Sequence, residues 1–398
     1  MRTNIQLIAL AALVALTFSS CQNDEDSMSS PQSSQKGTPD FSENGANPDE
    51  DFMSGAQARN SQSGYIYTES NATALNEILC YKQHGNGSLT LVSTVASGGI
   101  GSGTNLGSQG ALAISNNHQW LFACNAGDNT ISSFSIAKNG SLTLMQTIGS
   151  GGIKPVSLAL YQDRLYVANQ TSANISGFSI GAEGTITVIG GSNRQLSAST
   201  ADPGQISFSL NGNYLYVTER GTNVIATYPV SVTGSAGAGS FLASAGVTPF
   251  GFDYARGDYM IVANAAGDIP NLSSVSSYSG VNTANLSAVN GAVPNNQAAA
   301  CWMVTTKHGR FAFTTNFVSN TISSYYVAPW GSVYLAHQAA APASAPRDII
   351  IASNNYYVYS INTGDNTIGG YTRAVLGDLN VLNSTTGLPD HAAGLVAW

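Results

Sequence analysis

The stretch LYVANQTSANISGF, from Leu165 to Phe178, is the unit from which the fold of this chain can be worked out. An apolar run ends at Asn169, a short polar turn follows, and a second run ends in an aromatic residue nine positions after that Asn. Runs of β-branched and aromatic residues on both sides of a polar turn are typical of a β-hairpin. The stretch therefore predicts two short antiparallel strands.

The same hairpin recurs along the chain. Six further copies begin at Tyr65, Leu121, Leu215, Met260, Phe313 and Tyr359. The position that ends the first strand of the hairpin holds Glu69, Asn125, Asn169, Glu219, Asn264, Asn316 and Asn362, so neighbouring copies lie 44 to 56 residues apart. Repeats of a few short strands at such a period indicate a β-propeller, here with seven blades.

Two more strands complete each repeat. An apolar strand with a tight turn precedes the hairpin, as in ISFSLNGNYLY from Ile206, and a polar turn with a fourth strand follows it, as in AKNGSLTLMQTI from Ala137. Asn-Gly turns favour hairpins because both residues tolerate positive φ. We therefore expect an all-β protein with four antiparallel strands in each blade, running from an inner to an outer strand.

The first repeat lacks an inner strand before Tyr65, and the chain ends in AAGLVAW, residues 392–398. This segment resembles the inner-strand segment GALAI that begins at Gly110. We expect it to supply the inner strand of the first blade, which would close the ring and remove two exposed sheet edges.

The N-terminus reads as a targeting segment. Arg2 precedes an apolar run, Ile5 to Phe18, that is too short for a comfortable membrane span and ends in Ser19-Ser20-Cys21. Residues 1–20 are predicted to be a bacterial lipoprotein signal peptide, with Cys21 as the lipidated first residue of the mature chain. An ordinary secretory signal with an incidental Cys is the alternative.

Residues 21–60 are predicted to be a disordered acidic tether and residues 61–398 the propeller. From 22 to 60 there are eight acidic and two basic residues, a net charge of −6; Arg2 adds +1 and residues 61–398 contribute −3, which gives the total of −8. The acidic run after Cys21 resembles the export signal of surface-exposed lipoproteins, so we expect a cell-envelope protein of the outer membrane. A plain acidic linker is the alternative.

The composition also limits which partners and cofactors can be expected. The propeller has no basic patch of the kind that nucleic acids require, and we expect a monomer with a lipid anchor to the membrane. Cys80, Cys124 and Cys301 lie in apolar runs and are expected to be buried free thiols, with one disulfide as the alternative. No cysteine or histidine spacing predicts a metal site, and no motif predicts a cofactor.

Strand direction places the start of each inner strand and the turn after each second strand on one face, the mouth of the ring. In a chain with only 9% charged residues, Glu219, Arg220 and Arg347 are the notable charges expected there. Local ion pairs are the alternative interpretation of all three. Further polar or aromatic candidates for contacts with a ligand at this mouth are Asn169, Gln205, Asn264, Trp302 and Asn316.

Two further expectations concern that face. A repeated Asn at a strand end commonly caps its own turn, and this is the alternative interpretation of the Asn positions. The five histidines are expected mostly on the opposite face; they are His84, His118, His308, His337 and His391.

The repeats resemble those of the seven-bladed lactonase propellers, which include 6-phosphogluconolactonase and 3-carboxymuconate cyclase. The resemblance rests on Val167-Ala168-Asn169, on Asn129-Thr130-Ile131 and on Pro346-Arg347-Asp348, and it covers about residues 65–398. It implies lactone chemistry, in which an acid or base and a cation act on the ester and its oxyanion. Glu219 would be the acid or base, and Arg220 and Arg347 the cations.

The chain departs from that family where histidines open the inner strands of blades three and four; Val156 and Gln205 stand there instead. The sequence therefore leaves two functions open. One is a lactonase-like enzyme that acts on an extracellular lactone or carboxylate. The other is a non-catalytic propeller that binds a glycan or a protein partner at its rim.

Overall fold

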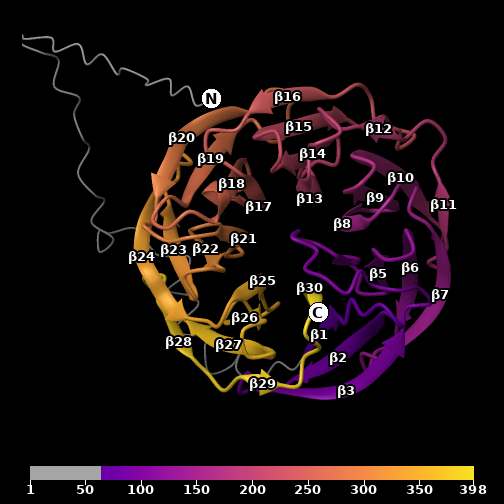
Figure 1. Ribbon diagram of the computed structural model, residues 1–398, viewed down its shortest axis with the longest axis horizontal. Coiled ribbons are helices and arrows are strands. Elements are labelled where there is room, and N and C mark those ends of the chain that lie inside the picture. Colours follow the sequence, from indigo (N-terminus) through magenta and orange to yellow (C-terminus); the bar gives the residue numbers. More distant parts are fainter. Residues whose placement is uncertain (1–63) are drawn as a thin grey trace, which may run out of the picture. The chain divides into compact units, whose positions relative to one another are not determined.

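The computed structural model describes residues 64–398, in which strands form seven antiparallel sheets arranged as the blades of a ring (Figure 1). This confirms the predicted seven-bladed propeller. The expected signal peptide, Cys21 and the acidic tether lie outside the described residues. Within residues 64–398, no helix has the length and apolar character needed to cross a membrane.

Blades are given from the inner to the outer strand. Blade one consists of β30 (Ala393–Ala397), β1 (Gly64–Glu69), β2 (Glu77–Gln83) and β3 (Leu89–Ala96). Blade two consists of β4 (Leu112–Ile114), β5 (Trp120–Asn125), β6 (Thr130–Ile136) and β7 (Leu142–Gly149). Blade three consists of β8 (Pro155–Tyr161), β9 (Arg164–Asn169), β10 (Asn174–Ile180) and β11 (Ile186–Val188), with β12 (Arg194–Gln195) also paired to β10.

The remaining blades follow the same order. Blade four consists of β13 (Pro203–Phe208), β14 (Tyr214–Glu219), β15 (Val224–Pro229) and β16 (Ser240–Ala243). Blade five consists of β17 (Pro249–Ala255), β18 (Tyr259–Asn264), β19 (Ser274–Ser279) and β20 (Ser287–Pro294), with the short 3-10 helix η1 (Ala266–Asp268) after β18. Blade six consists of β21 (Ala300–Thr305), β22 (Phe311–Asn316), β23 (Thr321–Val327) and β24 (Val333–Pro342). Blade seven consists of β25 (Pro346–Ile351), β26 (Tyr357–Asn362), β27 (Thr367–Arg373) and β28 (Leu379–Val381), with β29 (Thr385–Thr386) also paired to β27.

The core lies between the blades. Second strands such as β9 are buried on both faces because each blade is sandwiched between two others, whereas the outer strand β3 consists of exposed and half-buried residues. The aromatic residue that ends each hairpin fills the space between blades; Phe134, for example, packs with Tyr67 and Cys80 of blade one. This packing explains why an aromatic recurs at that position of the repeat.

The ring closes as the sequence predicts. β30 pairs antiparallel with β1 from Ile66↔Ala397 to Glu69↔Ala393. Beyond the strand, the backbones of Tyr65 and Trp398 exchange hydrogen bonds of 3.0 and 2.8 Å, and their rings stack with centroids 5.2 Å apart. The label of the C-terminus in Figure 1 lies beside β1 for this reason.

The three cysteines of the described chain are all buried and free, as expected for thiols in apolar strands; they are Cys80, Cys124 and Cys301.

Candidate functional site

A loop formed by Asn105–Gly110, which we call the channel loop, crosses the centre of the ring before blade two begins. The backbone N–H of Gln109 donates to Gly204 O in blade four at 2.9 Å. The Gln109 side chain reaches blade six, where Nε2 donates to Met303 O at 2.7 Å and Oε1 accepts from Met303 N at 2.9 Å. Figure 1 shows this early segment of the propeller reaching the middle of the ring. The loop therefore lies across the centre of the ring at the mouth, with cavities beside it.

A cavity of about 150 Å³ and a smaller one lie beside the loop, and we call the larger of these the mouth pocket. Its walls are Asn105, Gly107, Arg220, Thr248, Phe250, Ala265, Gly267, Asp268, Cys301, Trp302 and Phe317. The smaller cavity, of about 10 Å³, is lined by Arg347, Asp348, residues 392–394, Trp302 and the channel loop. Trp302 and the loop separate the two cavities, so Arg220 and Arg347 lie on either side of them.

Irregular pairing at the start of the inner strands supplies several of these residues. The ladder to the second strand is interrupted between Pro249 and Phe252, between Ala300 and Met303, and between Arg347 and Ile349. A bulge leaves residues out of the ladder and changes the direction of their side chains. Phe250, Cys301, Trp302 and Asp348 are the cavity-lining residues that lie within these interruptions.

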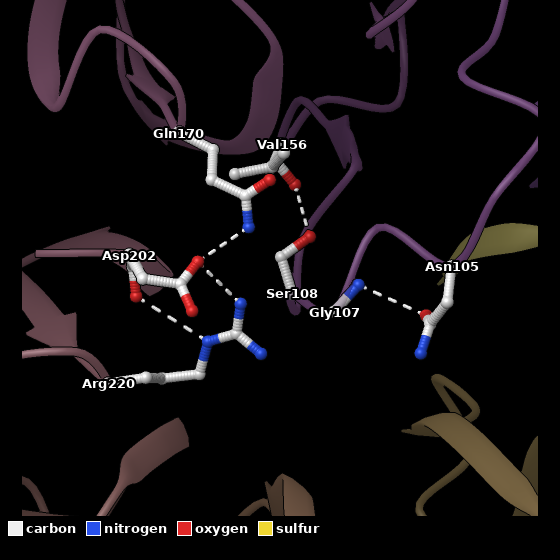
Figure 2. A network of polar contacts seen from close by, with 7 residues as sticks. All are labelled: Asn105, Gly107, Ser108, Val156, Gln170, Asp202 and Arg220. Atoms are coloured by element: carbon white, nitrogen blue, oxygen red, sulfur yellow. Dashed lines mark hydrogen bonds and ion pairs between the residues drawn. The ribbon is translucent and has the colours of Figure 1, made fainter. Parts of the chain in front are cut away.

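Arg220 follows the end of β14 and is held by the loop that opens blade four (Figure 2). Its Nη2 lies 2.7 Å from Asp202 Oδ1, which also accepts from Gln170 Nε2 at 2.6 Å. The guanidinium carbon lies 4.9 Å from the centre of the Phe250 ring. Figure 2 shows the guanidinium between Asp202 and Gly107. A methyl group added to Gly107 would lie 2.9 Å from Arg220 Nη1. Arg220 is therefore fixed in place and faces the channel loop.

Arg347, at the start of blade seven, is less fully bonded. Its guanidinium carbon lies 5.2 Å from the centre of the Phe317 ring, and its Nε atom is buried without a hydrogen-bond partner. Burial lowers the pKa of Arg347, since it disfavours the charged form. The charges of both arginines also act on the buried thiol of Cys301, whose pKa is nevertheless raised by burial. The two cations thus lie at the same mouth, on opposite sides of Trp302 and both within electrostatic reach of Cys301.

Glu219 is placed differently from the two arginines. It is fully buried at the end of β14; Oε1 accepts from Ser197 N at 3.0 Å, and Oε2 accepts from Ser197 Oγ and from Thr222 Oγ1, the latter at 2.7 Å. It is not among the residues that line either cavity of the mouth. Its contacts are those of a residue that caps the turn leading to Arg220.

The three Asn residues among the candidate ligand contacts are also fully buried: Asn169, Asn264 and Asn316. Asn264 Nδ2 donates to Ser276 Oγ at 2.9 Å, and Asn316 Nδ2 donates to Ser323 Oγ at 2.8 Å, so both amides bond within their own blades. This geometry fits the turn-capping interpretation.

The two remaining candidates lie on inner strands. Gln205 Oε1 accepts from Phe252 N at 2.6 Å and so ties blade four to blade five. Trp302 alone of the five ligand-contact candidates lines the mouth pocket, and its Nε1 donates to Ser108 O of the channel loop at 2.8 Å.

Two carboxyl groups that the sequence analysis did not select lie at the cavities. Asp268 lines the mouth pocket and is exposed. Asp348 lines the smaller cavity and is 4% exposed; burial raises its pKa to about 8, against the opposing effect of backbone N–H groups of Leu395, Ile349 and Gly394. Asp348 is consequently a neutral acid near pH 7, and it can exchange a proton in the physiological range.

The other missed residues had weak signals. The channel loop corresponds to the longest interval between repeats, the 56 residues from Glu69 to Asn125.

His391 is an exception to the expected placement of the histidines, because it is exposed two residues before β30, at the mouth face. Among residues 64–398, no group of three or more His, Cys, Asp and Glu side chains could hold a metal ion.

Comparison with known proteins agrees with this architecture. The model of the family "Lactonase, 7-bladed beta-propeller" matches residues 56–199 and 185–284, which together make up more than half of the chain. The chain therefore belongs to the seven-bladed β-propeller lactonase family. No curated protein sequence gives a match.

Solved structures share the fold at low identity. A periplasmic gluconolactonase of Pseudomonas aeruginosa is 16% identical, with a TM-score of 0.68, over 83% of this chain and 99% of that chain. A candidate 6-phosphogluconolactonase of Bacteroides uniformis is 18% identical, with a TM-score of 0.69, over 84% of this chain and 99% of that chain. A protein of Lactobacillus plantarum is 18% identical, with a TM-score of 0.70, over 85% of this chain and the whole of that chain.

Proposed function

We propose that this protein binds a small carboxylate or lactone at the mouth of the propeller, between Arg220 and Arg347, and that it acts on the ester bond of a lactone there. The observation that carries the proposal is the buried Nε of Arg347, which has no partner. A buried N–H of a guanidinium favours an acceptor strongly, and a carboxylate or an oxyanion matches its geometry.

Hydrolysis would add water across the ester bond. A base takes a proton from the water as its oxygen attacks the carbonyl carbon, and an acid returns a proton to the ring oxygen when the C–O bond breaks. Asp268 and Asp348 are the carboxyl groups that line the cavities, and the arginines would stabilise the oxyanion. In this proposal Glu219 acts as a positioning residue for Arg220, through the turn that it caps.

The test is binding and turnover of aldonolactones, gluconate and muconate-type acids by the wild type and by Arg347→Ala. Losing one charge-assisted contact costs about 1.5–3 kcal/mol, so Arg347→Ala should weaken binding or turnover roughly 10- to 150-fold. Arg164→Ala is the matched control, because Arg164 lies on β9 and donates to Val232 O away from the mouth. Equal affinity and rate in Arg347→Ala and the wild type would refute the proposal.

A glycan-binding propeller is the second candidate. The observation that favours it is a cavity of about 410 Å³ between blades two and three on the opposite face, lined by Asn116, Asn117, Gln119, Trp120 and Gln162 among others. Amide groups beside an aromatic ring suit the hydroxyls and the apolar faces of sugars. A glycan that binds the wild type and Arg347→Ala equally, with no response to any acid or lactone, would favour this function.

We also propose that the protein is anchored in the cell envelope through a lipid on Cys21, because an apolar run ends in Phe18-Ser19-Ser20 directly before this cysteine. A periplasmic location of the gluconolactonase of Pseudomonas aeruginosa is compatible with this placement. Cys21→Ala should move the protein from the membrane fraction to the soluble fraction. Retention of the variant in the membrane fraction would contradict the proposal.

A further inference from the structure

The turn between β18 and β19 is longer than its counterparts and forms one wall of the mouth pocket. It runs through residues 265–273, whereas the corresponding turn of blade two, between β5 and β6, has only residues 126–129. Gly267 and Asp268 of this turn line the pocket. Next to them Ile269 and Leu272 are 52% and 58% exposed, although both are large aliphatic side chains.

Two more exposed aliphatic side chains directly neighbour lining residues of the pocket in the chain. Val247 is 58% exposed, and its carbonyl accepts from Ala266 N at 3.0 Å, so it is joined directly to the long turn. Val318 is 45% exposed and follows Phe317, which lines the pocket from blade six. We call Val247, Ile269, Leu272 and Val318 the apolar rim of the mouth pocket.

The inside of the mouth pocket combines aromatic rings with one cation, Arg220. The rings of Phe250 and Trp302 lie 5.0 Å apart, and Arg220 stacks on the Phe250 ring. Beyond Arg220, the polar side chains of the lining are Asn105, Thr248 and Asp268, with the weakly polar thiol of Cys301. A polyhydroxylated acid would need a hydrogen-bond partner for each buried hydroxyl, and these few groups are not enough for one.

The volume of the pocket restricts what can enter it. About 150 Å³ holds a carboxylate or a lactone ring with little else, so the rest of a larger ligand must lie on the rim. On that rim an apolar group would remove aliphatic surface from water, whereas a hydroxylated group would gain nothing there.

We infer that the ligand of the mouth pocket is a monocarboxylic acid, or its lactone, with an aliphatic or aryl group that covers the apolar rim. The inference rests on the proposed function, because it needs the carboxylate or lactone to be held at the mouth by Arg220, which lines this pocket, and by Arg347, which contacts the ring of Phe317 in its wall. It adds the chemical class of the remainder of the molecule, and it assigns that remainder to Ile269 and Val318.

The test compares hexanoate with gluconate by titration calorimetry on the full-length protein. The two acids have the same number of carbon atoms and the same carboxylate, and they differ in the hydroxyl groups of gluconate. Hexanoate should bind more tightly, and butanoate, hexanoate and octanoate should gain about two- to fourfold in affinity for each CH₂ that reaches the rim.

Substitutions in the apolar rim test whether the gain in affinity for longer acids arises there. Ile269→Ser and Val318→Ser should each weaken octanoate severalfold and leave butanoate unchanged. Val232→Ser is the matched control, because Val232 is 92% exposed in the turn after β15, on the opposite face. All three side chains are exposed, so none of the substitutions should prevent folding.

The possible results distinguish a failure of this inference from a failure of the proposed function. Tighter binding of gluconate than of hexanoate, or equal octanoate affinity in the rim variants and the wild type, would overturn the inference and leave the carboxylate site standing. Absence of binding for every acid, or binding that Arg347→Ala does not weaken, would overturn the proposed function together with the inference.

Discussion

Replacing Asp348 by Asn should stabilise the protein above neutral pH and remove much of the pH dependence of its unfolding. Asp348 is 4% exposed, and burial raises its pKa from 3.8 to about 8. Between these two values the folded protein binds a proton that the unfolded chain releases. The stabilisation from this proton is therefore fully present below pH 3.8 and is lost as the pH rises towards 8.

The size of the effect follows from that interval. The difference between about 8 and 3.8 is roughly four pH units, and about 1.4 kcal/mol per unit gives an upper bound on the order of 5 kcal/mol. A local opening of the structure that admits water to the Asp348 carboxylate would reduce this difference in stability. Asn has the shape of the protonated acid and cannot ionise, so Asp348→Asn should match the wild type near pH 4 and exceed it most at pH 8.

Urea unfolding at several pH values between 4 and 8 measures this difference. Glu69 is the second acid to consider, because it is fully buried, its pKa is also raised by burial, and the charge of Asp348 adds to the rise. Glu69→Gln keeps Asp348 and should therefore retain part of the wild-type slope. Parallel curves of stability against pH for Asp348→Asn and the wild type would refute the reasoning.

Two further predictions concern the ring. Deleting residues 392–398 removes β30 and leaves β1 with an unpaired edge, so the cooperative thermal transition should disappear; an unchanged Tm would show that the ring does not depend on this closure. Gly251→Ala places a methyl group against Gln109 Oε1 and should speed hydrogen exchange in the channel loop, whereas Gly291→Ala, in open space on β20 of the same blade, should not; equal exchange in the two variants would contradict this.

Much of the fold could be predicted because its signals are local. A hairpin of fixed length sets the register of each blade, since side chains alternate with a period of two and the turn fixes which residues face each other. The predicted strand ends, such as Asn169 and Asn316, are the observed ends of β9 and β22. The lack of an inner strand before Tyr65, together with the inner-strand pattern of residues 392–398, predicted how the ring closes.

The candidate site could be predicted only in part. Strand direction places Arg220, Arg347 and Trp302 at the mouth, and the structure brings all three to the cavities there. Glu219 precedes Arg220 by one residue, yet the structure buries it, with its carboxylate hydrogen-bonded to Ser197. Neighbouring residues at a strand end point in opposite directions, and sequence position alone does not say which of them faces the mouth.

The seven blades, their register and the position of the charges at one face follow from local sequence, because each depends on residues a few positions apart. The path of the channel loop, the burial of Asp348 and the contacts of the arginines with aromatic rings arise instead from the folded ring. These features depend on contacts between blades, such as that of Gln109 with Met303, 194 residues away. No local pattern specifies such a contact, because it forms only when the closed ring brings the two segments together.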